Sequence, residues 1–127
     1  MKRRFKGESV HKVDAKGRVS VPAPFRRVLE EGDPDWAPGL NPNLVLVYGG
    51  PSGRCLEGYT IEAVAALDDK ISRMPTFSRN RKALERWLNT KSVYAQMDET
   101  GRALLPQKLR EMMGIGGEAV FAGMGDT

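Results

Sequence analysis

A ten-residue segment occurs twice in this chain of 127 residues, and the repeat limits the architectures that the chain can adopt. The first copy covers residues 13–22 and the second covers residues 97–106. One offset of 84 positions, the difference between Asp14 and Asp98, also aligns other identical or similar residues. These are Gly17 with Gly101, Arg18 with Arg102, Pro22 with Pro106, Phe25 with Leu109, and Arg26 with Arg110. So many matches at one offset predict a duplicated structural unit.

Each copy predicts a β-hairpin with a tight turn. The side chains of Asp14 and Asp98 can accept hydrogen bonds from the turn backbone, and Gly17 and Gly101 supply the positive φ that such a turn requires. Strands are predicted for residues 9–13 and 19–21, because apolar and polar residues alternate there. Arg18 follows the turn directly, so its cation is expected to project outward.

Residue spacing predicts a short helix and a second hairpin after the first copy. Residues 24–32 begin with proline and end with glycine, which marks both ends of a helix. Its expected apolar face consists of Phe25, Val28 and Leu29. Residues 44–48 form the apolar run of a buried strand, residues 49–53 a turn, and residues 55–59 the antiparallel partner.

A two-helix spacer is predicted between the copies. Thr60 can cap a helix that runs to about Met74, with Asp69 four residues before Arg73. Its expected apolar stripe consists of Ile61, Val64, Leu67, Ile71 and Met74. A second helix is expected to begin at Ser78, with Leu84, Trp87 and Leu88 as its apolar face.

The second copy repeats the order of the first. Strands are predicted for residues 92–97 and 102–105, a helix for residues 107–114, and a strand for residues 118–123 that corresponds to residues 44–49. The helix is expected to turn Leu109, Met112 and Met113 inward. The first copy continues into a return strand, whereas the chain ends at Thr127. We therefore expect a truncated form of a longer protein.

The positive charge of the chain is unevenly distributed. The net charge is +4, but residues 1–30 and 70–91 each hold a clear excess of Lys and Arg. Such an excess is typical of a phosphate-binding face, although a basic run is more often a solvated surface. No apolar run reaches the roughly 20 residues of a membrane span, and the charged N-terminus lacks the apolar region of a secretory signal.

The chemistry-bearing residues do not indicate catalysis. His11 is the only histidine and lies in a predicted strand, and Cys55 is the only cysteine and is expected in the core. They cannot supply the usual ligands of a transition metal, so no metal or other cofactor is expected. The single cysteine excludes an intramolecular disulfide and indicates a reducing compartment. Asp68 and Asp69 are adjacent on a helix and point in different directions. The sequence therefore predicts that the protein is not an enzyme.

Two Asp-x-x-Gly-Arg segments, each followed by an apolar strand, a proline and a short helix, resemble the MraZ family, a duplicated member of the AbrB-like swapped-hairpin group. The resemblance covers Phe5 to Asp126. It implies an α+β fold with a β-barrel-like core made from two AbrB-like repeats related by a pseudo-twofold axis. The repeats would cover residues 5–59 and 91–127, with residues 60–90 as the spacer, in one compact unit.

The resemblance also implies a function and a partner. The chain is expected to be a sequence-specific transcriptional regulator that forms a ring-like homo-oligomer. It would bind direct repeats upstream of a division and cell-wall gene cluster, in the cytoplasm at the nucleoid, without a membrane or small-molecule partner. Two departures from the family are Pro24, where a basic residue is common, and the missing C-terminal Glu-Ile-Trp stretch. The alternative is a protein-interaction or antitoxin-like module with a basic face.

The expected DNA-binding residues lie around the two copies and at the N-terminus. They are Arg18, Lys16, Lys12, Arg102, Arg3 and Arg4, and the loop-structuring residues are Asp14, Gly17, Asp98 and Gly101. Arg18 could also pair with Asp14, and both roles are compatible. The first copy is expected to contribute more, because Lys12 and Lys16 attract phosphate whereas Glu99 in the second copy repels it. Arg3 and Arg4 are expected in a flexible arm or a solvated tail.

Overall fold

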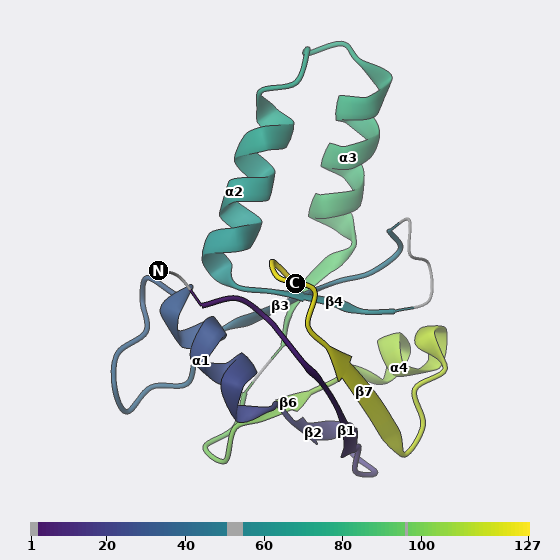
Figure 1. Ribbon diagram of the computed structural model, residues 1–127. Coiled ribbons are helices and arrows are strands. Elements are labelled where there is room, and N and C mark those ends of the chain that lie inside the picture. The colour runs from purple at the N-terminus through teal and green to yellow at the C-terminus, as the bar shows by residue number, and fades with distance from the viewer. Residues whose placement is uncertain (1–2, 51–54, 96) are drawn as a thin grey trace.

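The computed structural model describes residues 3–50, 55–95 and 97–127 and has a mixed α+β fold (Figure 1). The elements are β1 (Glu8–Lys12), β2 (Arg18–Ser20), α1 (Ala23–Glu31), β3 (Leu44–Val47), β4 (Glu57–Tyr59), α2 (Ile61–Ser72), α3 (Arg79–Thr90), β5 (Ser92–Ala95), β6 (Arg102–Leu104), α4 (Gln107–Met113) and β7 (Glu118–Ala122). Part of the turn predicted at residues 49–53, and Gln96 of the strand predicted at residues 92–97, lie outside the described residues.

The hairpin predicted at each Asp-x-x-Gly-Arg turn forms only next to the turn. Among the described residues, one bridge joins the segments on either side of each turn: Val13 to Val19, and Met97 to Ala103. Beyond these bridges, β2 pairs with β6 and places Val19 opposite Ala103, and both residues are 1% exposed. The pairing of β2 with β6 buries these side chains, and a short isolated hairpin could not bury them. A strand of the first half, the part of the chain before α2, therefore pairs with a strand of the second half, the part after α3.

This pairing between the halves is reciprocal. The strand before the first turn, β1, pairs with β7 near the C-terminus, and the strand before the second turn, β5, pairs with β3 of the first half. The predicted antiparallel pairing of β3 with β4 is confirmed. The expected barrel-like core is not formed in the described residues, which make two two-stranded sheets and one three-stranded sheet. The short strands and their sharp changes of partner divide the sheet into these pieces.

The short helices that follow the turns hold the main core. In α1 the predicted apolar face is confirmed, since Phe25, Val28 and Leu29 are all buried. In α4 only part of the prediction holds: Leu109 is buried, whereas Met112 is 52% exposed. The helix has only seven residues, so it presents a narrower face to the core than the sequence pattern suggests.

Helices α2 and α3 form a hairpin that projects from the sheets (Figure 1). The predicted cap at Thr60 is confirmed, because Thr60 Oγ1 accepts from the Ala63 amide. The second helix was expected to begin at Ser78; it begins at Arg79, and Ser78 caps it, because Ser78 Oγ accepts from the Arg81 amide. The hairpin packs on β3 in a second core of Val45, Val47, Ile71 and Leu88. Leu84 is 37% exposed, so its predicted place on the buried face is wrong. No helix in the described ranges is both long and apolar enough to cross a bilayer.

Thr60 is expected to contribute measurably to stability through its cap. It is 7% exposed, and its hydroxyl lies 3.0 Å from the Ala63 amide nitrogen. Thr60→Ala should lower the free energy of unfolding by about 1 kcal/mol, because a helix donor then loses its acceptor. Denaturant unfolding monitored by circular dichroism measures this loss. Thr60→Ser keeps the hydroxyl and should lose less; equal losses would show that the cap contributes nothing.

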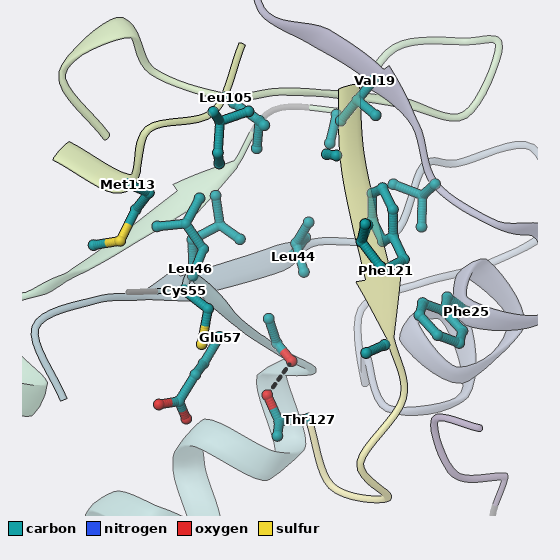
Figure 2. A pocket seen from close by; sticks show the side chains of 18 of the residues that line it. Val19, Phe25, Leu44, Leu46, Cys55, Glu57, Leu105, Met113, Phe121 and Thr127 are labelled. Atoms are coloured by element: carbon teal, nitrogen blue, oxygen red, sulfur yellow. Dashed lines mark hydrogen bonds between the residues drawn. The ribbon is translucent and has the colours of Figure 1, made fainter. Parts of the chain in front are cut away.

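The main core opens into a cavity of about 380 Å³ that reaches from the β3–β4 sheet to β7 (Figure 2). Its lining is mostly apolar and includes Phe25, Leu46 and Phe121. Cys55 also lines it and is exposed, so its predicted burial in the core is wrong. Near the cavity, the Thr127 hydroxyl donates a hydrogen bond of 3.0 Å to the Gly58 carbonyl.

Candidate functional site

The first turn, residues 14–18, is organised by the carboxylate of Asp14. Its Oδ1 atom accepts from the amides of Lys16 at 3.0 Å and Arg18 at 2.8 Å. The Gly17 amide donates to the Asp14 carbonyl at 2.9 Å, and Gly17 has a φ of +88°. A left-handed φ favours glycine because other residues strain there. Asp14 and Gly17 together determine the shape of this turn.

The second turn, residues 98–102, repeats the arrangement with one addition. Asp98 Oδ1 accepts from the amides of Thr100 at 3.0 Å and Arg102 at 2.9 Å, and Gly101 has a φ of +79°. The Thr100 hydroxyl also donates to Asp98 Oδ1 at 2.8 Å and accepts from Arg102 Nε at 3.0 Å. Lys16 occupies the position of Thr100 in the first turn, so the second turn has more internal hydrogen bonds.

In each turn the arginine is held by the aspartate. Arg18 Nε lies 2.7 Å from Asp14 Oδ2, and Arg102 Nε lies 2.8 Å from Asp98 Oδ2. The two arginine side chains are 38% and 35% exposed. A partly exposed ion pair adds only about 0–1 kcal/mol to stability, so its main effect is to orient the guanidinium. The bond to the aspartate uses Nε in each turn, so the Nη atoms stay outside that bond.

The two turns lie at opposite ends of the short antiparallel β2–β6 pair. The Gly17 carbonyl accepts from the Leu105 amide at 2.8 Å, and the Gly101 carbonyl accepts from the Val21 amide at 3.1 Å. Arg102 Nη1 also lies 4.0 Å from the carboxylate of Asp14. Both turns are at the end of the molecule opposite the α2–α3 hairpin (Figure 1). We call the two turns together, residues 14–18 and 98–102, the paired-turn surface.

The turn hydrogen bonds stabilise the ionised aspartates. Donation from the Arg102 amide, helped by both Thr100 donors and opposed by partial burial, lowers the pKa of Asp98 to about 2. The Arg18 amide is likewise the main reason that the pKa of Asp14 is lowered. Both carboxylates are thus charged near neutral pH, and each neutralises part of the charge of its own arginine.

Acid is expected to weaken the second turn at low pH. The folded pKa of Asp98 lies below its ordinary value of 3.8, so its contribution is present above about pH 4 and is lost as the pH falls through about 2. A carboxyl-carbon NMR titration should give a midpoint near pH 2. Thr100→Ala removes the hydroxyl donor and should raise that midpoint, whereas an unchanged midpoint would contradict the role of Thr100.

The lysines near the first turn belong to the same region, whereas the N-terminal arginines do not. Lys16 is an exposed turn residue, and Lys12 is exposed at the end of β1 next to the turn. Arg3 and Arg4 lie beyond the other end of β1, where their side chains pair with Glu31 at 3.9 Å and Asp126 at 3.4 Å. The adjoining Phe5 forms a bridge with Gly125.

Arg26 and Arg110 lie at the paired-turn surface, although the sequence gives no reason to place them there. A Cβ atom on Gly101 would lie 2.6 Å from Arg26 Nη1, and one on Gly17 would lie 2.6 Å from Arg110 Nε. Each arginine thus packs on the turn of the other half. The only sequence signal for these two residues is that they match at the same offset as the turns.

The residues considered for catalysis are not gathered at this surface. His11 packs edge-on against Phe121, with ring centroids 5.4 Å apart, and Ser9 Oγ lies 2.9 Å from its Nε2. In the ranges that the structure describes, no group of three or more His, Cys, Asp or Glu side chains could hold a metal ion. The chemistry of the paired-turn surface is that of two arginines oriented by carboxylates.

Comparisons with known proteins identify the relatives of this chain. The model of a family described as "MraZ protein, putative antitoxin-like" matches residues 4–87. The transcriptional regulator MraZ of Ruegeria sp. (strain TM1040) is 54% identical over 127 residues, which cover 100% of this chain and 76% of the relative. The transcriptional regulator MraZ of Ruegeria pomeroyi has the same identity and coverage. That of Cereibacter sphaeroides is 45% identical over 126 residues, covering 94% of this chain and 74% of the relative. The chain belongs to the MraZ family.

Proposed function

We propose that this protein is a DNA-binding transcriptional regulator that contacts DNA through the paired-turn surface. The observation that carries the proposal is the pair of turns joined by β2 and β6, each of which presents an arginine oriented by an aspartate. The relatives named as transcriptional regulators support this role. The role is non-enzymatic and belongs to the cytoplasm, at the nucleoid.

The partly exposed guanidinium groups can bind both the phosphate backbone and the base edges of a DNA duplex. An arginine can bind phosphate or donate two hydrogen bonds to O6 and N7 of guanine in the major groove. The first turn is the stronger candidate, because the exposed Lys12 and Lys16 add phosphate attraction there. In the second turn Arg102 Nε is shared by Asp98 and Thr100, and Glu99 is exposed. We therefore rank Arg18 above Arg102.

The finer part of the proposal concerns assembly and target. We infer a ring-like homo-oligomer that binds direct repeats upstream of a division and cell-wall gene cluster. One pair of short turns offers a small contact area, so several copies that bind adjacent repeats would supply affinity through avidity. The resemblance of the two Asp-x-x-Gly-Arg segments to the family supports this assembly.

Titration of the DNA upstream of the protein's own gene tests the proposal. A gel shift at physiological salt should show tighter binding to this DNA than to a scrambled duplex of the same composition and length. Lower salt should strengthen binding to both, because phosphate contacts release counterions. Equal affinity for the two duplexes at physiological salt would overturn the proposed function.

A second candidate function is a protein-interaction module, and one observation favours it. Phe77, between α2 and α3, is 87% exposed, and Arg73 and Arg79 near it are exposed as well. An aromatic side chain among cations suits an acidic partner with apolar groups. Weak salt dependence of DNA binding, together with a stably copurifying protein that Phe77→Ala releases, would favour this candidate over DNA recognition.

A further inference from the structure

Arg26 and Arg110 connect the two halves of the chain in the same way. Arg110 Nε donates to the Leu105 carbonyl at 3.0 Å, and the Leu105 amide donates to the Gly17 carbonyl at 2.8 Å. The guanidinium of Arg110 then lies against Gly17, with Cζ 2.8 Å from the position of a Cβ atom there. These contacts form a closed set of three residues, two from the second half and one from the first turn.

The same set occurs with the halves exchanged. Arg26 Nε donates to the Val21 carbonyl at 3.2 Å, and the Val21 amide donates to the Gly101 carbonyl at 3.1 Å. The guanidinium of Arg26 lies against Gly101, with Cζ 2.9 Å from the position of a Cβ atom. Each arginine is thus tied to the end of the return strand in its own half and packs on the turn of the other half.

These contacts differ from those of the arginines inside the turns. Arg26 and Arg110 are half-buried, and no ion pair joins either one to a carboxylate in the part of the chain that the structure describes. Their bonds go to backbone carbonyls, and their planar groups cover the glycine that precedes Arg18 or Arg102. A planar group suits close packing on a glycine, which a lysine side chain cannot match.

We propose that Arg26 and Arg110 are positioning residues that act across the halves: Arg110 holds the first turn, and with it Arg18, while Arg26 holds the second turn and Arg102. This inference rests on the proposed function. Loss of Arg110 would leave Gly17 without its cover and let the first turn vary in conformation. Arg18 would then meet DNA in the required orientation less often, and affinity would fall without loss of a direct contact.

Double-mutant cycles of DNA affinity test this crossed arrangement. Fluorescence anisotropy with the upstream duplex is measured for four single variants: Arg18→Ala, Arg102→Ala, Arg26→Ala and Arg110→Ala. It is also measured for the double variants that combine residues from different halves (Arg18 with Arg110, and Arg102 with Arg26) and from the same half (Arg18 with Arg26, and Arg102 with Arg110). Arg110→Ala should weaken binding about 3- to 10-fold alone and in the Arg102→Ala background, but should add little once Arg18 is absent. Arg26→Ala should show the same dependence on Arg102. Additive losses in every pair, or coupling within the same half, would overturn the inference.

Two further variants separate positioning from direct phosphate contact and from misfolding. Arg110→Lys keeps the charge but lacks the planar group, so it should bind DNA as weakly as Arg110→Ala; recovery of wild-type affinity would overturn the inference. Arg110→Gln keeps a donor for the Leu105 carbonyl and replaces Arg110→Ala in the cycle if circular dichroism shows that the latter is unfolded. Wild-type protein that binds upstream and scrambled DNA equally would refute the proposed function itself. If the wild type binds upstream DNA selectively but the affinity losses of all double variants are additive, only the positioning across the halves is refuted.

Discussion

Gly17→Ala is expected to lower the free energy of unfolding by about 2–4 kcal/mol, from the strain of a left-handed residue and from steric overlap. Gly17 has a φ of +88°, and a Cβ atom there would lie 2.6 Å from both the Leu105 carbonyl oxygen and Arg110 Nε. The carbonyl belongs to the backbone that pairs with the turn, so it cannot move away without breaking that contact. Chemical denaturation of the variant and the wild type measures the loss.

Two other glycines provide graded controls for this prediction. Gly7 has a similar φ of +94° but nothing within 4 Å of a Cβ position, so Gly7→Ala should show the conformational strain alone. At Gly101 the three nearest atoms all belong to the Arg26 side chain, which can move more easily than backbone. Gly17→Ala should therefore cost the most and Gly7→Ala the least. A loss for Gly17→Ala no larger than that for Gly7→Ala would show that the first turn is not closely packed on Leu105 and Arg110.

Arg18→Ala is expected to weaken binding to the upstream DNA by about 10- to 100-fold, the range for loss of one good bidentate base contact. If several subunits bind one DNA, the loss per subunit accumulates and the measured effect is larger. Arg102→Ala should give a smaller loss, because the second turn carries Glu99 and lacks a lysine. Anisotropy titrations at physiological salt measure both affinities.

Arg73→Ala provides a matched control for the removal of a cation. Arg73 also pairs with an aspartate four residues before it, with Nη2 3.1 Å from Asp69 Oδ2, but it lies on the α2–α3 hairpin away from the turns. Its removal should leave DNA affinity nearly unchanged. A loss for Arg73→Ala equal to that for Arg18→Ala would indicate nonspecific charge attraction, and a larger loss for Arg102→Ala would reverse the ranking of the two turns.

The local features of the fold could be predicted from the sequence because short-range chemistry determines them. The cap at Thr60, the buried face of α1 and the ion pair of Asp69 with Arg73 all depend on residues a few positions apart. The bond between Asp14 and Arg18 also falls within one turn, and the sequence indicates it as one of two compatible roles.

Contacts between the halves could not be predicted in the same way. The alternation of apolar and polar residues shows which face of β1 or β2 is buried, but it does not identify the partner strand. The pairing of β1 with β7 and of β2 with β6 could therefore not be predicted from it. For the same reason, the alignment of Arg26 with Arg110 in the repeat does not indicate which glycine each arginine covers. Exposure of Cys55 and Met112 likewise depends on how the elements assemble.

Hydrogen–deuterium exchange with and without the upstream duplex tests the central claim most directly, because it locates the contact on the chain. The amides of Lys16 and Arg18, and of Thr100 and Arg102, are bonded to the turn aspartates and report on both turns. DNA should slow exchange in peptides that cover residues 14–18 and 98–102 and leave the α2–α3 hairpin unchanged. Slower exchange confined to α2 and α3, with both turns unaffected, would contradict a DNA-binding role for the paired-turn surface.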